Sequence, residues 1–150
     1  MKYEIIKVLR VLFPFALTLF LWRMEHSFWN PGGILALIPI FYCSFVRTTP
    51  WFSSFSVVMC FLLDYNFSLP FYWTAMYCIA YAMHRFQDFI DLSQIDKNAL
   101  GAFSIFFSIT MMIFAFSNIG WTVLFKSIWC IIFASALYIP LTVLIDRVRK

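Results

Sequence analysis

Charged side chains are scarce in this sequence. Only 12% of its 150 residues are Asp, Glu, Lys or Arg, about half of the roughly 25% that a soluble domain carries. Hydrophobic residues make up 63%, against about 45–50% in such a domain, so the polar residues are too few to cover the apolar surface. This balance excludes a soluble enzyme, a nucleic-acid-binding module and a secreted disulfide domain. It predicts one polytopic all-helical membrane domain over residues 1–150.

The sequence also lacks the usual motifs of catalytic, metal-binding and phosphate-binding sites. The chain has two histidines, His26 and His84, and they are far apart. It has no HExxH, no GxSxG and no glycine-rich phosphate loop. No two of its four cysteines form a CxxC pair, and all four lie in apolar stretches, which predicts free thiols in the core. We therefore expect no catalytic residue, no metal and no cofactor.

Charges and histidines divide the chain into apolar runs of membrane-spanning length. At roughly 20 residues per span, 150 residues allow six spans and little else. The longest run contains the turn-forming sequence Ser117–Gly120, which predicts a break there. The expected spans are residues 5–23, 31–46, 49–63, 69–86, 99–117 and 121–145. Spans three and four are short, and the alternative for them is a tilted or re-entrant hairpin around Asp64.

The basic residues predict the orientation. With both termini in the cytoplasm, nine basic residues lie inside and only Arg23 and Lys126 lie outside, which agrees with an even number of spans. The nine are Lys2, Lys7, Arg10, Arg47, Arg85, Lys97, Arg147, Arg149 and Lys150. Lys126 is expected to reach outward from span six. The basic tail around Arg147 is expected to contact anionic headgroups, and the charge distribution predicts no nucleic-acid face.

Three residues inside or beside the spans are candidates for a special role. Pro31 opens span two, where a proline needs no N–H, and Pro140 lies inside span six, where it predicts a kink. Asp64 is an ionisable residue near the membrane, which is costly without a partner. One interpretation is proton or cation binding or contact with a partner subunit. The other is an interfacial turn, Asp64–Asn66, without further function.

Aromatic residues mark the predicted span ends. Five tryptophans lie there and are interpreted as anchors at the membrane interface rather than as a ligand site. They are Trp22, Trp29, Trp51, Trp73 and Trp121. Between spans four and five, residues 84–97 contain a short amphipathic pattern that predicts a helix docking a cytoplasmic partner or lying on headgroups. On span five, Ser104 and Ser108 form a small-xxx-small pair, which favours close helix packing.

Several stretches resemble the rod shape-determining protein MreD family of the bacterial inner membrane. They are Asn30-Pro31 with the following aliphatic run and Phe41-Tyr42, then Phe61–Asp64, then Ile79–Tyr81, and finally Leu137–Arg149 with Pro140. The resemblance covers roughly residues 30–86 and 130–150. The chain departs from the family at Cys60, where glycine is usual, and at Leu69-Pro70, where Leu-Gly is usual. It is therefore similar to a divergent member.

The resemblance implies a non-enzymatic scaffold subunit of the cell-elongation machinery in the bacterial inner membrane. Such proteins bind the single-span partner MreC and work with an actin-like filament protein and the synthases of peptidoglycan. Pro31, Asp64, Pro140 and Arg147 would then be structural or partner-contact residues. The alternative is the substrate-binding membrane subunit of an energy-coupling-factor-type vitamin importer, which would need a polar ligand cavity. A third interpretation is a small proton-coupled carrier that uses Asp64.

Overall fold

The computed structural model describes the chain except for residues 1, 26–30, 70, 87–98, 119 and 150. The described residues are helical, with no strand among them. The elements are α1 (Lys2–Trp22), η1 (Gly32–Ala36), α2 (Leu37–Phe41), η2 (Tyr42–Val46), α3 (Phe52–Asn66), α4 (Tyr72–Phe86), α5 (Ala99–Ser117) and α6 (Trp121–Arg149). The predicted all-helical class is confirmed. The amphipathic pattern predicted for residues 84–97 falls almost entirely outside the described residues.

Two helices are long and apolar enough to cross a membrane. They are Ala99–Ser117 and Trp121–Val148, with mean hydropathy of 2.1 and 2.3. They meet at the predicted break, since α5 ends at Ser117 and α6 begins at Trp121. Across this hairpin, the Ser104 hydroxyl lies 3.2 Å from that of Ser135, so small polar side chains do meet where the helices approach.

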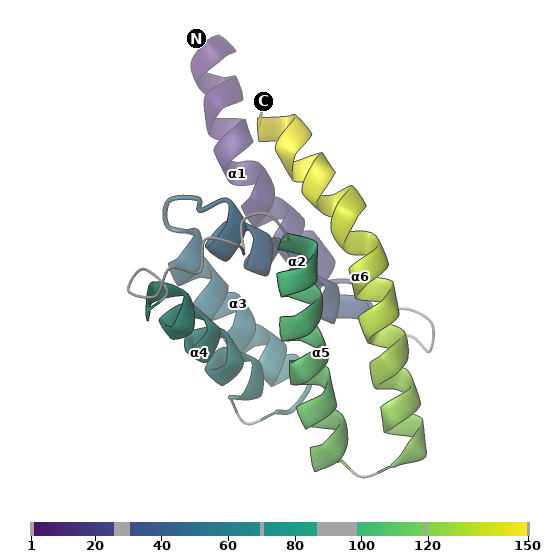
Figure 1. The fold of residues 1–150 in the computed structure, drawn as a ribbon. Helices are drawn as coiled ribbons and strands as arrows, with labels where there is room; N and C mark the ends of the chain where they lie inside the picture. The colour runs from purple at the N-terminus through teal and green to yellow at the C-terminus, as the bar shows by residue number, and fades with distance from the viewer. Residues whose placement is uncertain (1, 26–30, 70, 87–98, 119, 150) are drawn as a thin grey trace.

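The α3–α4 hairpin is shorter. Each helix has 15 residues, which is about 22 Å at about 1.5 Å per residue, against about 30 Å for the hydrocarbon core of a bilayer. Each of the two helices is therefore shorter than the hydrocarbon core, and tilting would shorten its reach further. Both hairpin turns lie at the end of the molecule opposite the two termini (Figure 1). The two termini share one end.

A buried central segment forms the middle of the core. Residues 32–46 form one continuous run of 3-10, α and π turns, and all of them except Val46 are buried. Pro39 lies in the middle of this run and has no N–H to donate, so regular i→i−4 bonding is interrupted there. A segment that is apolar on every side is stable only when other helices surround it.

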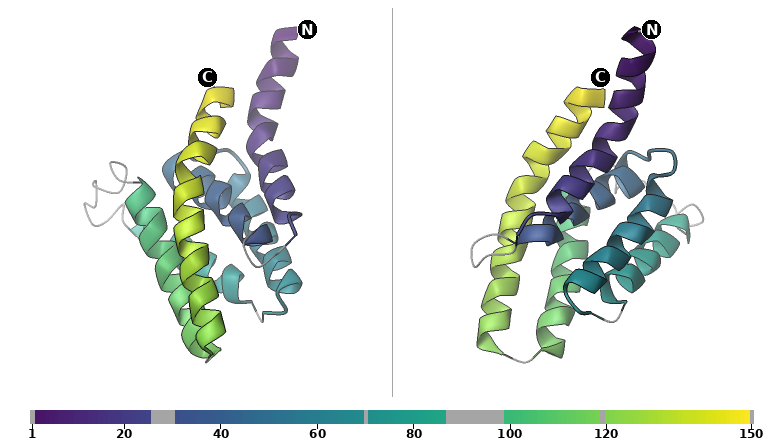
Figure 2. Two further views of the ribbon diagram at one scale, coloured as in Figure 1. Left: turned by 90° about the vertical axis from the view of Figure 1, so that its right-hand side faces the viewer. Right: turned by 180° about the vertical axis from the view of Figure 1, so that it is seen from behind.

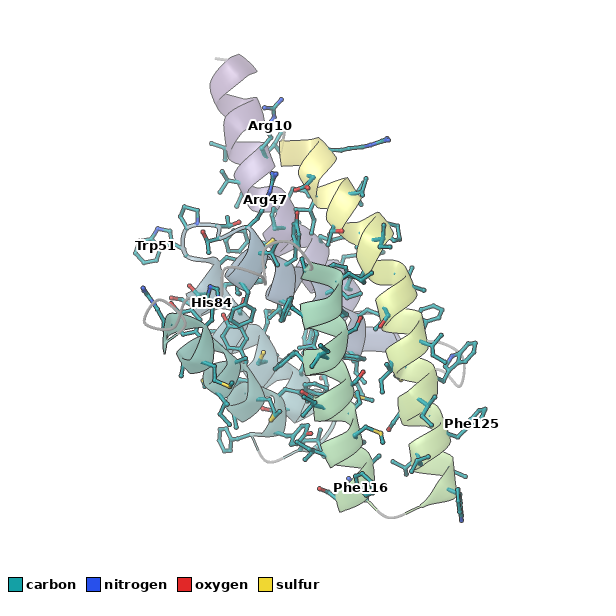
Figure 3. The ribbon with its side chains drawn as sticks, in the orientation of Figure 1. Arg10, Arg47, Trp51, His84, Phe116 and Phe125 are labelled. Atoms are coloured by element: carbon teal, nitrogen blue, oxygen red, sulfur yellow. The ribbon has the colours of Figure 1, made fainter. Side chains whose placement is uncertain are left out.

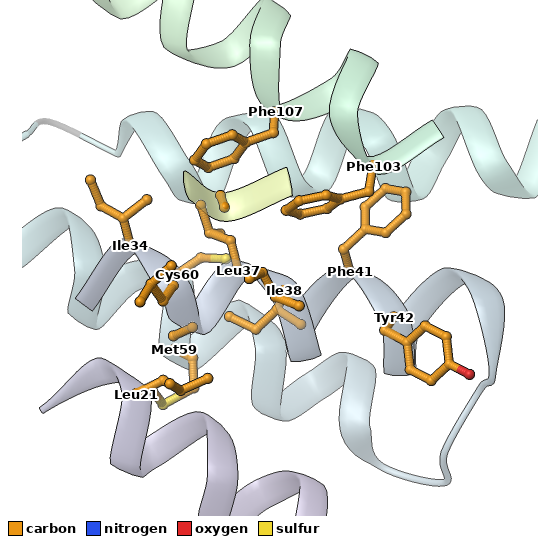
Figure 4. Close-up of a cluster of buried hydrophobic side chains, with 14 of the residues drawn as sticks. Leu21, Ile34, Leu37, Ile38, Phe41, Tyr42, Met59, Cys60, Phe103 and Phe107 are labelled. Atoms are coloured by element: carbon orange, nitrogen blue, oxygen red, sulfur yellow. The ribbon is translucent and has the colours of Figure 1, made fainter. Parts of the chain in front are cut away.

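Other helices pack around this segment on several sides (Figure 4). Phe41 packs edge-to-face on Phe103 of α5, with ring centroids 5.5 Å apart. Phe103 stacks on Tyr138 of α6 at 4.7 Å. On other sides lie Met59 of α3 and Leu21 of α1, both buried. The core therefore lies around residues 32–46, and the two hairpins and α1 form the outer layer.

The ends of the molecule differ in charge. Arg10 and Arg47 lie toward the end that carries both termini, whereas Phe116 and Phe125 lie at the opposite end (Figure 3). The N-terminal part of α1 extends beyond the other helices in every view (Figure 2). Arg47 makes an ion pair with Asp146 of α6 at 3.4 Å, and both side chains are partly exposed.

Three expectations need correction. Trp51 and Trp121 are 84% and 89% exposed, as anchors should be, but Trp73 is only 3% exposed and belongs to the core. Cys78 is exposed, whereas the other three thiols are buried. Asp64 does not lie in a turn, because α3 continues to Asn66. In each case, the surroundings of the residue depend on which helices pack around it and not on how close it lies to the end of a predicted span.

Candidate functional site

Asp64 is buried and accepts three hydrogen bonds. It is 3% exposed. One carboxylate oxygen accepts the Trp73 backbone N–H at 2.7 Å. The other accepts the Thr74 backbone N–H at 3.0 Å and the Thr74 hydroxyl at 2.7 Å. The carboxylate thus satisfies two of the four N–H groups that the first turn of a helix leaves without a partner.

This arrangement is a helix cap supplied by a different helix. Trp73 and Thr74 are the second and third residues of α4, which are the positions that a capping side chain normally bonds. The residue before α4 is Phe71, which has no side-chain acceptor and a left-handed backbone, with φ of 54°. Negative charge at a helix N-terminus is also favoured by the helix dipole. Asp64 therefore closes the α3–α4 hairpin and starts α4.

Asp64 also holds the loop between α3 and α4 through its backbone carbonyl group. The Leu69 N–H donates to the Asp64 carbonyl oxygen at 2.9 Å. Ser68, like Phe71, has a positive φ, of 52°, a conformation that costs energy for residues other than glycine. Side-chain and backbone bonds at Asp64 hold this loop in its conformation. The sequence predicted neither partner, because Trp73 and Thr74 lie beyond the turn.

Pro31 begins the segment that packs beside this hairpin. It is fully buried and precedes η1. A Cβ on Gly33 would lie 2.9 Å from the Trp22 carbonyl oxygen and 3.6 Å from Cδ2 of Leu63. Only glycine allows the end of α1 and the end of α3 to approach the backbone so closely. The chain two residues after Pro31 therefore packs against Leu63, the residue before Asp64.

The remaining two predicted residues lie elsewhere. Pro140 is exposed on α6, which continues through it as one curved helix (Figure 1). Arg147 is exposed on the last turns of α6, at the end that carries the termini. The structure therefore places the neighbours of Pro31 and Asp64, Gly33 and Leu63, against each other, and it places Pro140 and Arg147 on α6.

A chain of hydroxyl groups crosses the interior near the central segment. The Tyr77 hydroxyl donates to Ser44 at 3.0 Å, Ser44 and Ser56 are 3.1 Å apart, and the Ser56 hydroxyl donates to the Phe52 carbonyl at 2.8 Å. All three side chains are buried. Because each buried hydroxyl has a partner, this chain links η2, α3 and α4 without leaving an unpaired group.

A cavity lies at the end opposite the termini. Its volume is about 270 Å³, and it is bounded by η1, the α3–α4 loop, the start of α4, the end of α5 and the start of α6. Most of its lining is apolar, and Asn118, Lys126 and Ser127 are the polar exceptions. The sequence signal for this cavity is Lys126, one of two basic residues predicted on the outer side. Among the described residues, no group of three or more His, Cys, Asp or Glu is placed to hold a metal ion.

Comparisons with known proteins identify no relative. No family model matches this chain, and neither a curated protein nor a solved structure matches it.

Proposed function

We propose that this protein is a non-catalytic scaffold subunit of the bacterial cell-elongation complex in the inner membrane. In this proposal its helices form six membrane segments with both termini in the cytoplasm. Two helices of membrane-spanning length support it. So do the two termini at one end, with Arg10 and Arg47 toward that same end (Figure 3).

One observation carries the proposal. Two of the stretches that resemble the MreD family pack together: Gly33, just after Asn30-Pro31, lies against Leu63, and the next residue, Asp64, caps α4. This packing gives a structural reason for the presence of an aspartate at the end of the third apolar stretch. Asp64 caps the N-terminus of α4. The close packing of residues 32–46 against the end of α3 requires glycine at position 33. These motifs act as one structural unit in this interpretation.

The geometry of Asp64 disfavours the proton-carrier alternative. A carrier group must gain and lose its proton during transport, and protonation of this carboxylate would remove acceptor capacity for the α4 N–H groups. Three hydrogen bonds hold the carboxylate in one position at the start of α4. A fixed structural carboxylate fits a scaffold better than a carrier.

The partner surface that we propose lies along α1. The N-terminal part of this helix extends past the other helices and is left uncovered (Figure 2). Leu9 and Leu12 on it are 60% and 52% exposed. In a membrane, a helix with one uncovered side packs against another helix through shape and van der Waals contact. The single-span elongation partner MreC is the proposed occupant.

The test is capture of the tagged chain from its host in a mild detergent, with partners identified by mass spectrometry. We expect recovery of the MreC partner and of peptidoglycan synthases, with the actin-like filament protein. Leu12→Trp should reduce that recovery, because it places a bulky side chain on the proposed surface. Ile109→Trp on α5 is the matched control, since Ile109 is also 52% exposed. Equal recovery with both variants would remove α1 as the partner surface.

The second candidate is the substrate-binding subunit of a vitamin importer of the energy-coupling-factor type. The cavity of about 270 Å³ is the observation that favours it. Its lining is mostly apolar, whereas a vitamin site would need more polar groups. Recovery of transporter ATPases in the same capture experiment, without wall synthases, would replace the scaffold proposal with this one.

A further inference from the structure

The two hairpins differ in the length of their helices. α3 and α4 have 15 residues each, whereas α5 has 19 and α6 has 29. At about 1.5 Å per residue, α3 and α4 are about 22 Å long, α5 about 28 Å and α6 about 43 Å. The hydrocarbon core of a typical bilayer is about 30 Å thick. The α5–α6 hairpin comes near or exceeds that thickness, and the α3–α4 hairpin does not.

The α3–α4 hairpin nevertheless exposes apolar side chains. Val57, Val58 and Phe61 of α3 are exposed, and so are Ile79 and Met83 of α4. The described part of the chain leaves these side chains uncovered. In a membrane, acyl chains contact such side chains, because they are as apolar as leucine.

Residues that favour the membrane–water interface mark both ends of this hairpin. Trp51 directly precedes α3 and Tyr65 lies in its last turn, and they are 84% and 79% exposed. Trp51 lies toward the same end of the hairpin as His84, in the last turn of α4, where Arg85 is also exposed (Figure 3). Tryptophan and tyrosine are enriched at the interface. Trp51 and Tyr65 are about 21 Å apart along the helix, so they bound a belt that is thinner than the hydrocarbon core by about 9 Å.

The α5 helix provides the contrast within the same molecule. Ala99–Ser117 contains no charged residue, no tryptophan and no tyrosine. Ile105, Ile109, Ile113 and Phe116 are exposed along it. Its whole length of about 28 Å can therefore lie in hydrocarbon. The protein thus presents a thin apolar belt on α3–α4 and a belt of ordinary thickness on α5.

We propose that the α3–α4 face selects lipids with short acyl chains and thins the bilayer beside it, while α5 contacts bilayer of ordinary thickness. A helix whose apolar belt is shorter than the local hydrocarbon core is accommodated by thinning of the bilayer. Short chains reduce the deformation that this thinning requires. The inference rests on the membrane placement in the proposed function and is independent of the scaffold role.

The test measures which lipid lies beside each helix. The full chain is reconstituted in equimolar phosphatidylcholines with monounsaturated chains of 14 or 18 carbons, one of the two brominated across its double bonds. Bromine quenches a fluorophore attached to a cysteine in the middle of a helix. Val58→Cys on α3 and Ile109→Cys on α5 are matched positions, since the wild-type side chains are 56% and 52% exposed. Both are made with Cys78→Ser, which by itself is the labelling blank because the other three thiols are buried.

Quenching in the mixture, calibrated in each lipid alone, gives the local ratio of short to long lipid. We expect a ratio of at least about two at Val58→Cys and of about one or less at Ile109→Cys. Exchanging which lipid carries the bromine should leave both ratios unchanged. Equal ratios at the two positions would overturn the inference and leave the membrane placement intact. Absence of quenching at both positions would overturn the membrane placement as well.

A variant of the belt tests its cause. Trp51→Leu combined with Tyr65→Leu replaces both interfacial side chains by apolar ones, so the ratio at Val58→Cys should fall toward one. Trp121→Leu is the matched control, because Trp121 is 89% exposed at the start of α6, and it should leave that ratio unchanged. If the double variant is not monodisperse, the comparison of Val58→Cys with Ile109→Cys decides. Quenching at Ile109→Cys without any at Val58→Cys would show that protein covers the α3–α4 face, and it would overturn the inference.

Discussion

Replacing Asp64 should destabilise the protein by an amount that its three hydrogen bonds allow us to estimate. A capping side chain contributes about 0.5–2 kcal/mol, and burial places this one at the upper end. The bond from the Thr74 hydroxyl to a charged acceptor adds about 1.5 kcal/mol. Asp64→Ala should therefore lower the free energy of unfolding by about 3 kcal/mol.

A graded series tests this estimate. Asp64→Asn keeps one acceptor oxygen but loses the charge and the second acceptor, so we expect roughly half of the loss, about 1.5 kcal/mol. Thr74→Val removes only the hydroxyl bond and should cost about 1.5 kcal/mol. The order of stability should be wild type, then Asp64→Asn and Thr74→Val, then Asp64→Ala.

The measurement is equilibrium unfolding in mixed micelles with increasing dodecyl sulfate, followed by circular dichroism. Glu25→Ala is the control. Its side chain is exposed, so its loss should cost less than about 0.5 kcal/mol. A loss below about 0.5 kcal/mol for Asp64→Ala would refute the capping argument. Asp64→Asn that folds normally, reaches the membrane at normal levels and yet abolishes function would refute a purely structural role.

Three further results should follow from the packing. Gly33→Ala should destabilise the protein by about 1–3 kcal/mol, measured in the same titration, because its Cβ would lie 2.9 Å from the Trp22 carbonyl oxygen. Tyr77→Phe should cost about 1 kcal/mol in that assay, since a buried serine hydroxyl loses its donor; an unchanged midpoint would contradict this. In a cysteine-free background, Asn118→Cys should react with an impermeant maleimide on intact cells, and Thr48→Cys only after permeabilisation. The reverse pattern would contradict the proposed orientation.

The sequence alone determined the class of the fold and most helix ends. Hydropathy and charge are properties of single residues and their near neighbours, so they predict where a helix can be buried and where it must stop. Ser117–Gly120 marked the α5–α6 turn, and Pro31 marked the start of the central segment. The irregular turns around Pro39 follow from the same local chemistry, since proline lacks the N–H that an α-helix needs.

Only the tertiary structure decided what surrounds Asp64, Trp73 and Lys126. Whether an aspartate near a span end lies in an interfacial turn or caps another helix depends on how the chain returns after the loop, and neither residue type nor spacing specifies that path. Trp73 lies near a span end like the anchors, yet the first turn of α4 packs inward and buries it. The cavity beside Lys126 exists because helices distant in sequence meet around it. Contacts between distant segments are the physical reason that these roles were not predictable from the sequence.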